Sequence, residues 1–147
     1  MNVYFICTGN TCRSPMAEAL FQSKKKEGMH ARSAGIFAMD GGDISRNSKQ
    51  LIQEAGIEYN QLSRQIVEED VRWADLILTM TTAHKELVMQ AFPFAADRIF
   101  TLKEYVRPYG SQDVSDPFGG DIHMYRKTFQ ELEMLTNELH EKLNNEK

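Results

Sequence analysis

Short apolar runs alternate along the chain with longer segments whose apolar residues recur every three or four positions. Four such runs predict strands, at residues 2–6, 30–37, 74–80 and 97–102. The intervening and following segments predict four helices, at residues 15–27, 48–57, 82–92 and 122–143. Because strands and helices alternate, the pattern indicates an α/β fold with a mostly parallel sheet.

The C-terminal part of the chain combines a long polar stretch with a strongly amphipathic segment. Residues 103–121 predict a long loop, and loops of that length in compact domains tend to be functional or disordered. The helix after it has one apolar stripe, formed by Ile122, Tyr125, Phe129, Leu132, Leu139 and Leu143. The last four residues, 144–147, are predicted to fray. The length of 147 residues predicts one domain over residues 1–147.

Composition narrows the class of protein. A net charge of −4 argues against general nucleic-acid binding, which needs a basic surface. No apolar run approaches the roughly 20 residues that span a membrane, and the N-terminus lacks the pattern of a signal peptide. These features predict a cytoplasmic protein without membrane contact. The four histidines lack ligand spacing and both cysteines lie in one loop, so neither a structural metal nor a disulfide scaffold is expected.

Candidate chemistry is concentrated in the segment CTGNTCRS, Cys7 to Ser14, which follows the first predicted strand and precedes a helix. Ligands of open parallel sheets bind at this end of the strands. Backbone amides of such a loop, together with the positive end of the next helix, hold anions. Gly9 and Asn10 suit positive-φ turns, and Arg13 offers a planar fork for two phosphate oxygens.

Cys7 stands at the first position of this loop. The groups that hold a dianion also stabilise a thiolate, so Cys7 is predicted to be a nucleophile aimed at a bound phosphoryl group. Ser14 can donate a hydrogen bond to the sulfur. The simpler alternative is that Cys7 is a small buried apolar residue near Arg13 by chance. The full spacing Cys-x5-Arg-Ser between a strand and a helix favours catalysis.

The segment FICTGNTCRSPMAEAL resembles the phosphate-binding loop of the low-molecular-weight protein-tyrosine phosphatase family, and SAGIF, ADLILTMT and DPFGG extend the resemblance along the chain. It implies a single-domain, four-stranded parallel sheet with helices on both faces and the phosphate loop after the first strand. It also implies catalysis without a metal or organic cofactor. The implied phosphate-binding residues are Thr8, Gly9, Asn10, Thr11, Cys12, Arg13 and Ser14.

The resemblance also implies a general acid, Asp116 in SDPFGG, which protonates the leaving atom and then activates water. Taken alone, this stretch predicts a turn, with Asp121 capping the last helix. Phe118 would wall the cleft, and Asn10 and Ser33 would brace the loop by hydrogen bonds. Family members often have a histidine near Gln61 that contacts the loop asparagine; its absence here predicts a looser brace.

The substrate is less strongly determined. Thr11 replaces the bulky aliphatic residue usual in tyrosine phosphatases, and loops that read CTGNTCRS resemble bacterial protein-arginine phosphatases. Asp116 could pair with guanidinium N–H groups, while Phe37 and Phe118 could stack on that flat group. We therefore expect a phosphoarginine phosphatase, with phosphotyrosine as the alternative substrate. The simpler alternatives are that Thr11 is a tolerated loop residue and that Phe37 belongs to the core.

Cys12 is predicted to be a redox partner of Cys7. The resemblance implies that the two sulfurs approach closely enough for a disulfide under peroxide, which would be a reversible switch. The alternative is that Cys12 only packs under the loop. Arsenate reduction is disfavoured because no cysteine follows Cys12, and a phosphocysteine carrier or a binding module would not need Arg13 and Asp116 together. The expected partners are phosphorylated proteins and inorganic phosphate, with the protein acting as a monomer.

Overall fold

A four-stranded sheet, with every strand parallel, forms the centre of the computed structural model, which describes residues 1–145. The strands lie in the order β2-β1-β3-β4. Their bounds are Asn2–Cys7 for β1, His30–Gly35 for β2, Leu76–Thr79 for β3 and Ile99–Thr101 for β4. All four predicted strands are therefore confirmed. Because β1 is an inner strand, the chain that leaves it emerges at the middle of the sheet's carboxyl edge.

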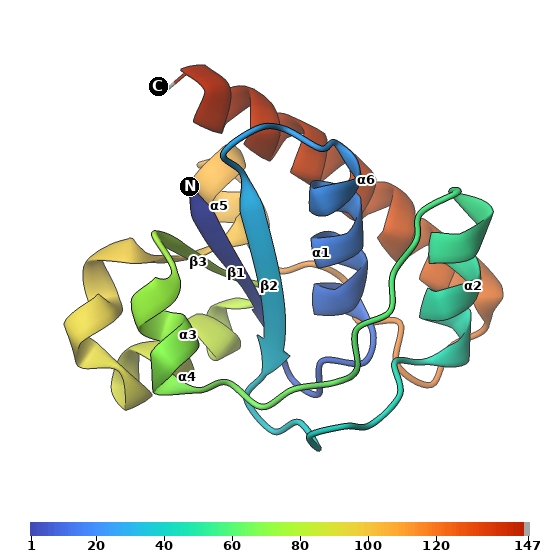
Figure 1. Ribbon diagram of the computed structural model, residues 1–147, viewed down its shortest axis with the longest axis horizontal. Coiled ribbons are helices and arrows are strands. Elements are labelled where there is room, and N and C mark those ends of the chain that lie inside the picture. Colours follow the sequence, from blue (N-terminus) through green and yellow to red (C-terminus); the bar gives the residue numbers. More distant parts are fainter. Residues whose placement is uncertain (146–147) are drawn as a thin grey trace.

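Helices cover both faces of the sheet, as predicted (Figure 1). Alternate side chains of β1 separate the core into two clusters. Val3 and Phe5 pack with α1 (Arg13–Ser23), α2 (Arg46–Glu54) and α6 (Ile122–Asn145). Tyr4 and Ile6 pack with α3 (Glu68–Trp73) and α4 (Thr82–Ala91). Both faces of β1 are thus buried, which explains its unbroken apolar sequence.

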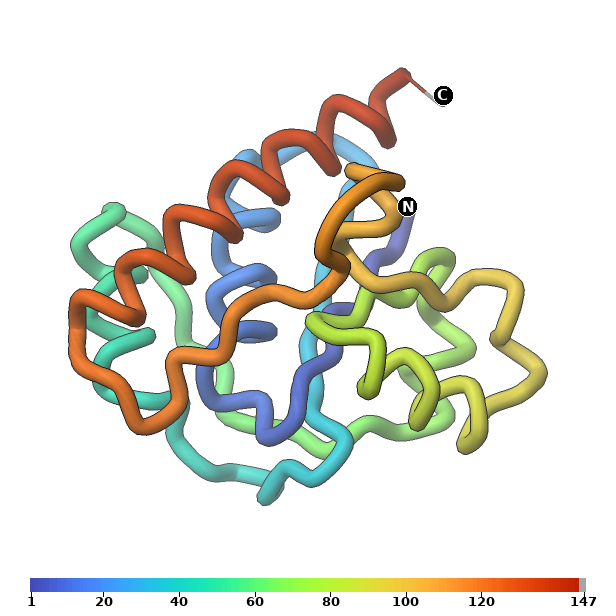
Figure 2. Tube along the Cα trace, turned by 180° about the vertical axis from the view of Figure 1, so that it is seen from behind, coloured from blue at the N-terminus to red at the C-terminus, as the bar shows by residue number. Residues whose placement is uncertain are grey.

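The long helix α6 crosses one face of the molecule (Figure 2). Five of the six residues predicted for its apolar stripe are buried, and Ile122 is partly buried against the same cluster. The helix continues to Asn145, so the predicted fraying is wrong for residues 144–145, and residues 146–147 lie outside the described part. Although α6 has 24 residues, no helix within residues 1–145 is long and apolar enough to cross a membrane.

Short helices account for most differences from the predicted elements. The structure adds α3, a 3₁₀ helix η1 (Pro93–Arg98) and α5 (Leu102–Val106), which lies in the predicted loop. α5 begins with a capping box between Thr101 and Glu104. The helix α1 starts at Arg13 and ends at Ser23, earlier than predicted, and Lys25 beyond it has a φ of 50°. The polar loop before α6 is therefore shortened to residues 107–121.

Candidate functional site

The loop between β1 and α1 is shaped by its close approach to β2. A Cβ atom added to Gly35 would lie only 2.5 Å from the Thr8 carbonyl oxygen, so only glycine allows this contact. Asn10 has a φ of 54°, in the left-handed region, whereas Gly9 does not have a positive φ, contrary to the prediction. Cys12 is the N-cap residue of α1, but its side chain accepts no hydrogen bond from the first backbone amides of the helix. The N-cap side chain therefore does not satisfy these N–H groups.

The side chain of Asn10 braces this loop from within. Its Nδ2 donates to Ser14 Oγ at 2.8 Å and to Ser33 Oγ at 2.9 Å. The backbone N–H of Arg64 donates to Asn10 Oδ1 at 2.9 Å, and Ser63 Oγ donates to the Asn10 carbonyl at 2.8 Å. The structure thus places Ser33 against Asn10, as the resemblance implied. Ser63 and Arg64 hold Asn10 in this chain, where the histidine of other family members is absent.

Glu18 extends the brace into the core, a role that no feature of the sequence indicated. Ser33 Oγ and Tyr59 Oη both donate to Glu18 Oε1, at 2.6 and 2.7 Å. Burial raises the pKa of Glu18, while the two hydrogen bonds oppose that rise. The hydroxyl of Ser33 is committed to Glu18, so its oxygen is left to accept from Asn10.

The sulfur of Cys7 lies 2.9 Å from Ser14 Oγ, and both residues are buried. Ser14 Oγ already accepts from Asn10 Nδ2, and the orientation of this amide is fixed because Asn10 Oδ1 accepts the backbone N–H of Arg64. The hydroxyl proton of Ser14 has two acceptors within reach, the Cys7 sulfur at 2.9 Å and the more distant Ala34 carbonyl at 3.4 Å. Both cysteines are free thiols, and Cys12 Sγ lies 3.2 Å from the hydroxyl of Tyr125 on α6.

Arg13 connects the loop to the segment before α6, which passes beside the start of α1 (Figure 2). Its guanidinium is buried and donates from Nη1 to the Val114 carbonyl at 3.0 Å. Its Nη2 lies 3.5 Å from Oδ2 of Asp116, whose side chain is half exposed. Asp116 Oδ1 accepts from the Phe118 amide at 3.0 Å, which fixes the carboxylate in a turn. Asp121 accepts from the Met124 amide and caps α6, so the two aspartates have separate positions.

These groups surround one cavity of about 210 Å³. Its lining brings together eight of the predicted site residues: Cys7, Thr8, Gly9, Thr11, Cys12, Arg13, Asp116 and Phe118. Asn10, Ser14 and Ser33 lie behind this lining as buried supports. The cavity therefore contains a thiol, a guanidinium and a carboxylate, which are the groups that phosphoryl transfer through a cysteine requires.

Two aromatic residues were predicted to sandwich the substrate, and they take different positions. Phe118 is 79% exposed and lines the cavity. Phe37 is 72% exposed and lies outside the lining, although its amide donates to the Thr8 carbonyl at 2.8 Å. The alternative that Phe37 belongs to the core is wrong. The structure thus supports one aromatic wall and places the second ring at the neighbouring surface.

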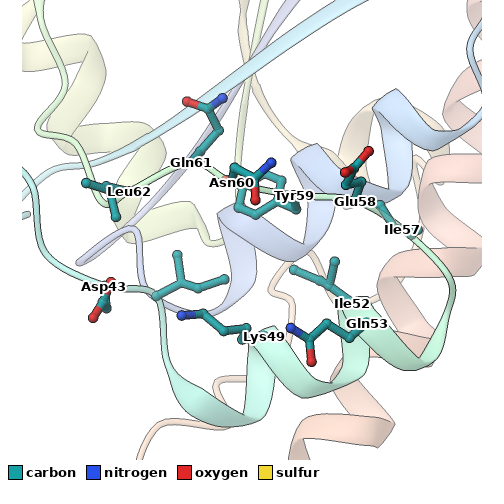
Figure 3. A pocket seen from close by; sticks show the side chains of 11 residues that line it. Asp43, Lys49, Ile52, Gln53, Ile57, Glu58, Tyr59, Asn60, Gln61 and Leu62 are labelled. Carbon is teal, nitrogen blue, oxygen red and sulfur yellow. The ribbon is translucent and has the colours of Figure 1, made fainter.

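Larger hollows lie away from this chemistry. One of about 350 Å³ separates α2 from the extended segment 57–62 (Figure 3). Asp43, Lys49 and Glu58 supply its charged side chains, and neither cysteine lines it. A second hollow, of about 650 Å³, lies by the end of α1 and also lacks both cysteines. Size alone would therefore have selected the wrong cavity.

His84 is a buried neighbour of the loop that sequence reasoning missed. Its Nε2 lies 2.8 Å from Thr8 Oγ1, across 76 positions of sequence, which no local motif could reveal. The pKa of His84 is lowered to about 4, chiefly by burial and next by the Arg13 cation. Asp116 and Asp113 oppose this shift. The imidazole is therefore neutral at neutral pH.

Acidification to pH 5 is expected to destabilise the protein partly through His84. Its pKa is about 4 when folded and about 6.5 when unfolded, so the unfolded chain binds more protons between these values. The stabilising contribution is complete above pH 6.5 and is lost towards pH 4, with a loss of about 2 kcal/mol by pH 5. Urea unfolding of the wild type and of His84→Gln at pH 7 and pH 5 measures it. A pH dependence identical in the two proteins would contradict this assignment.

The fold and the cavity together define a class: α/β proteins with a cysteine-centred phosphate loop at the carboxyl edge of a parallel sheet. A family model described as low molecular weight phosphotyrosine protein phosphatase matches residues 2–147. The chain belongs to this family.

Several phosphatases are similar to this chain over most of its length. A protein-arginine-phosphatase of Bacillus subtilis (strain 168) is 46% identical over 147 residues, covering 97% of each chain. A solved structure of the YwlE arginine phosphatase from Geobacillus stearothermophilus has a TM-score of 0.95 at 45% identity, covering 99% of this chain and 94% of that one. The low molecular weight protein-tyrosine-phosphatase PtpB of Staphylococcus aureus is 42% identical over 133 residues, covering 90% of this chain and 91% of that protein.

Proposed function

We propose that the protein is a cysteine-dependent phosphatase that hydrolyses phosphoarginine in proteins through a cysteinyl-phosphate intermediate. The observation that carries the proposal is the grouping of Cys7, Arg13 and Asp116 around one small cavity. Similarity to two protein-arginine phosphatases, each at 45% identity or more, supports the substrate. Phosphotyrosine is the alternative substrate, supported by the somewhat lower similarity to PtpB.

In the first step, the Cys7 thiolate attacks phosphorus while the bond between phosphorus and the guanidine nitrogen breaks. Asp116, in its carboxylic acid form, gives its proton to the departing nitrogen. The buried Arg13 guanidinium stabilises charge on the phosphoryl oxygens, helped by amides of the loop. The products of this step are a free arginine side chain and a phosphoryl group bonded to sulfur.

In the second step, a water molecule attacks phosphorus and the sulfur leaves as a thiolate. The Asp116 carboxylate takes the proton from that water, which restores its acid form. Ser14, 2.9 Å from the sulfur, donates a hydrogen bond to the departing thiolate. Asn10 donates to Ser14 Oγ and so leaves the Ser14 proton for an acceptor, of which the sulfur is nearer than the Ala34 carbonyl; the brace thereby contributes to the reaction as well as to the loop's shape. Inorganic phosphate is the final product.

Selection for phosphoarginine is assigned to Thr11, which lines the cavity with its hydroxyl 3.5 Å from Cys12 Sγ. A short polar side chain leaves room for the planar guanidinium beside the phosphoryl group, and Asp116 can accept from its N–H groups. Phe118 supplies an aromatic wall for stacking. A bulky aliphatic residue at position 11 would fill that room.

The experiment compares kcat/KM for matched phosphoarginine and phosphotyrosine peptides in the wild type, Thr11→Val and Thr11→Ile. The wild type is expected to prefer phosphoarginine, and Thr11→Ile to lose about tenfold or more of that preference through overpacking. Thr11→Val keeps the shape of threonine and so isolates the hydroxyl. A wild type that prefers phosphotyrosine would overturn the substrate proposal and leave the Cys7 mechanism in place.

Further expectations belong to the same proposal. A peroxide would oxidise Cys7 to a sulfenic acid, and attack by the Cys12 thiolate would expel hydroxide and form a disulfide that protects Cys7. Both cysteines are free thiols that line the same cavity, which supports this expectation. We expect the enzyme to act as a monomer in the cytoplasm, on phosphorylated proteins, without a metal or cofactor.

A further inference from the structure

We propose that His84 is a positioning residue that orients Thr8 and thereby prepares the first turn of the phosphate loop for its ligand. The direct observation is the 2.8 Å contact between His84 Nε2 and Thr8 Oγ1. Thr8 follows the nucleophile in the chain and lines the cavity, whereas His84 is only 6% exposed and lies behind it. The inference deepens the proposed function because it concerns the same phosphate site.

Thr8 is held from two directions. Its carbonyl accepts from the amide of Phe37 at 2.8 Å, and its hydroxyl contacts the imidazole of His84 at 2.8 Å. The side chain of Thr8 is otherwise exposed and would rotate among staggered positions. Because the carbonyl and the hydroxyl of Thr8 are both held, the residue has less conformational entropy to lose when phosphate binds. A preorganised site of this kind binds its ligand more tightly.

The position of His84 is itself built into the fold. Its backbone amide donates to Thr81 Oγ1 at the start of α4. The adjacent residue, Thr82, donates from its amide and its hydroxyl to Asp113, at 2.8 and 3.0 Å. The amide of Val114, the residue after Asp113, donates to the carbonyl of Met80 just beyond β3, and the Val114 carbonyl accepts from Arg13. The junction that fixes the imidazole therefore also anchors the loop that carries Asp116.

The protonation state of His84 suits a positioning role. The charged groups that act on it are Arg13 from α1 and Asp113 and Asp116 from the loop before α6, and with burial they leave the imidazole neutral at neutral pH. A neutral ring can fix the Thr8 hydroxyl without adding a second cation that would retain the phosphate dianion. Its other nitrogen, Nδ1, is buried and has no partner among the described residues.

The test measures binding of inorganic phosphate by calorimetry, so its result is independent of which phosphoamino acid is the substrate. The matched variants are His84→Gln, whose side-chain amide reaches the place of Nε2, and His84→Asn, whose amide reaches only the place of Nδ1. Thr8→Val removes the hydroxyl from the other side. We expect His84→Asn and Thr8→Val each to weaken phosphate binding by about three- to tenfold, the effect of one lost hydrogen bond.

His84→Gln is expected to bind phosphate within about twofold of the wild type, because it restores the contact. The double variant His84→Asn with Thr8→Val is expected to bind like either single variant, since both remove one interaction. Wild-type affinity in His84→Asn, or losses that add in the double variant, would overturn the proposal. Thr8→Val changes an exposed side chain, so it keeps the test informative if His84→Asn fails to fold.

Discussion

Replacing Cys7 by serine is expected to abolish turnover, with a fall in kcat on the order of 10⁴-fold or more. A serine hydroxyl is a far weaker nucleophile than a thiolate, and its phosphate ester gives up an oxygen that is a poorer leaving group than sulfur. The cavity and Arg13 remain, so inorganic phosphate should still bind. Steady-state kinetics on a phosphoarginine peptide and calorimetry with phosphate measure the two effects.

Cys12→Ser is the matched control, because it makes the same chemical change in the same loop. Cys12 contacts Tyr125 and lies at the start of α1, so this variant should keep much more turnover than Cys7→Ser. Near-normal turnover in Cys7→Ser would remove Cys7 from the mechanism. Loss of phosphate binding in the same variant would show that the substitution had disrupted the loop. The fall in turnover would then not be evidence for the role of the sulfur.

Replacing Asp116 by asparagine is expected to lower kcat by about 10²- to 10⁴-fold, the usual contribution of a general acid and base. Asparagine keeps the size and the hydrogen bond from the Phe118 amide but cannot donate or take the catalytic proton. The largest loss is expected with leaving groups that need protonation. Measuring kcat on a phosphoarginine peptide and on an activated aryl phosphate separates these cases.

Asp121→Asn provides the control on the same loop. Asp121 caps α6 through the Met124 amide and does not line the cavity, and asparagine is as good a cap as aspartate. This variant should therefore retain its activity and stability. An Asp116→Asn enzyme as active as Asp121→Asn, on a substrate with a poor leaving group, would exclude Asp116 as the acid.

The four strands could be predicted because the burial of each strand is reflected in its run of apolar residues. Residues 3–7 of β1 are all buried, so an unbroken apolar run was sufficient to place the strand. The short helices were missed because so little of them faces the core: Val71 is the buried residue of α3, and Leu102 that of α5. The start of α5 depends on the capping box between Thr101 and Glu104. Such a cap is hard to recognise in the sequence when it lies next to a long polar stretch.

Some features of the candidate site could likewise be predicted from the sequence and others could not. Cys7, Arg13 and Ser14 could be predicted because they share one loop, and Asp116 because a resemblance pointed to it. The contacts of His84, Glu18 and Tyr125 could not be predicted, since each joins residues from distant segments. Phe37 was misplaced for a related reason: an aromatic residue after a strand suggests either a core or a stacking role, and its exposed position depends on the path of the following loop.

Rapid-quench mass spectrometry of the wild-type enzyme mixed with a phosphoarginine peptide shows whether Cys7 carries the phosphoryl group during turnover. A phosphoryl group is expected to appear transiently on the proteolytic fragment that contains Cys7, at a rate no slower than the release of inorganic phosphate. In Cys7→Ser, any phosphoryl group on the same fragment should form more slowly and then persist, because a serine oxygen is a poor leaving group. Release of phosphate from the peptide with no phosphoryl group ever detected on Cys7, or with one on another residue, would exclude Cys7 as the nucleophile.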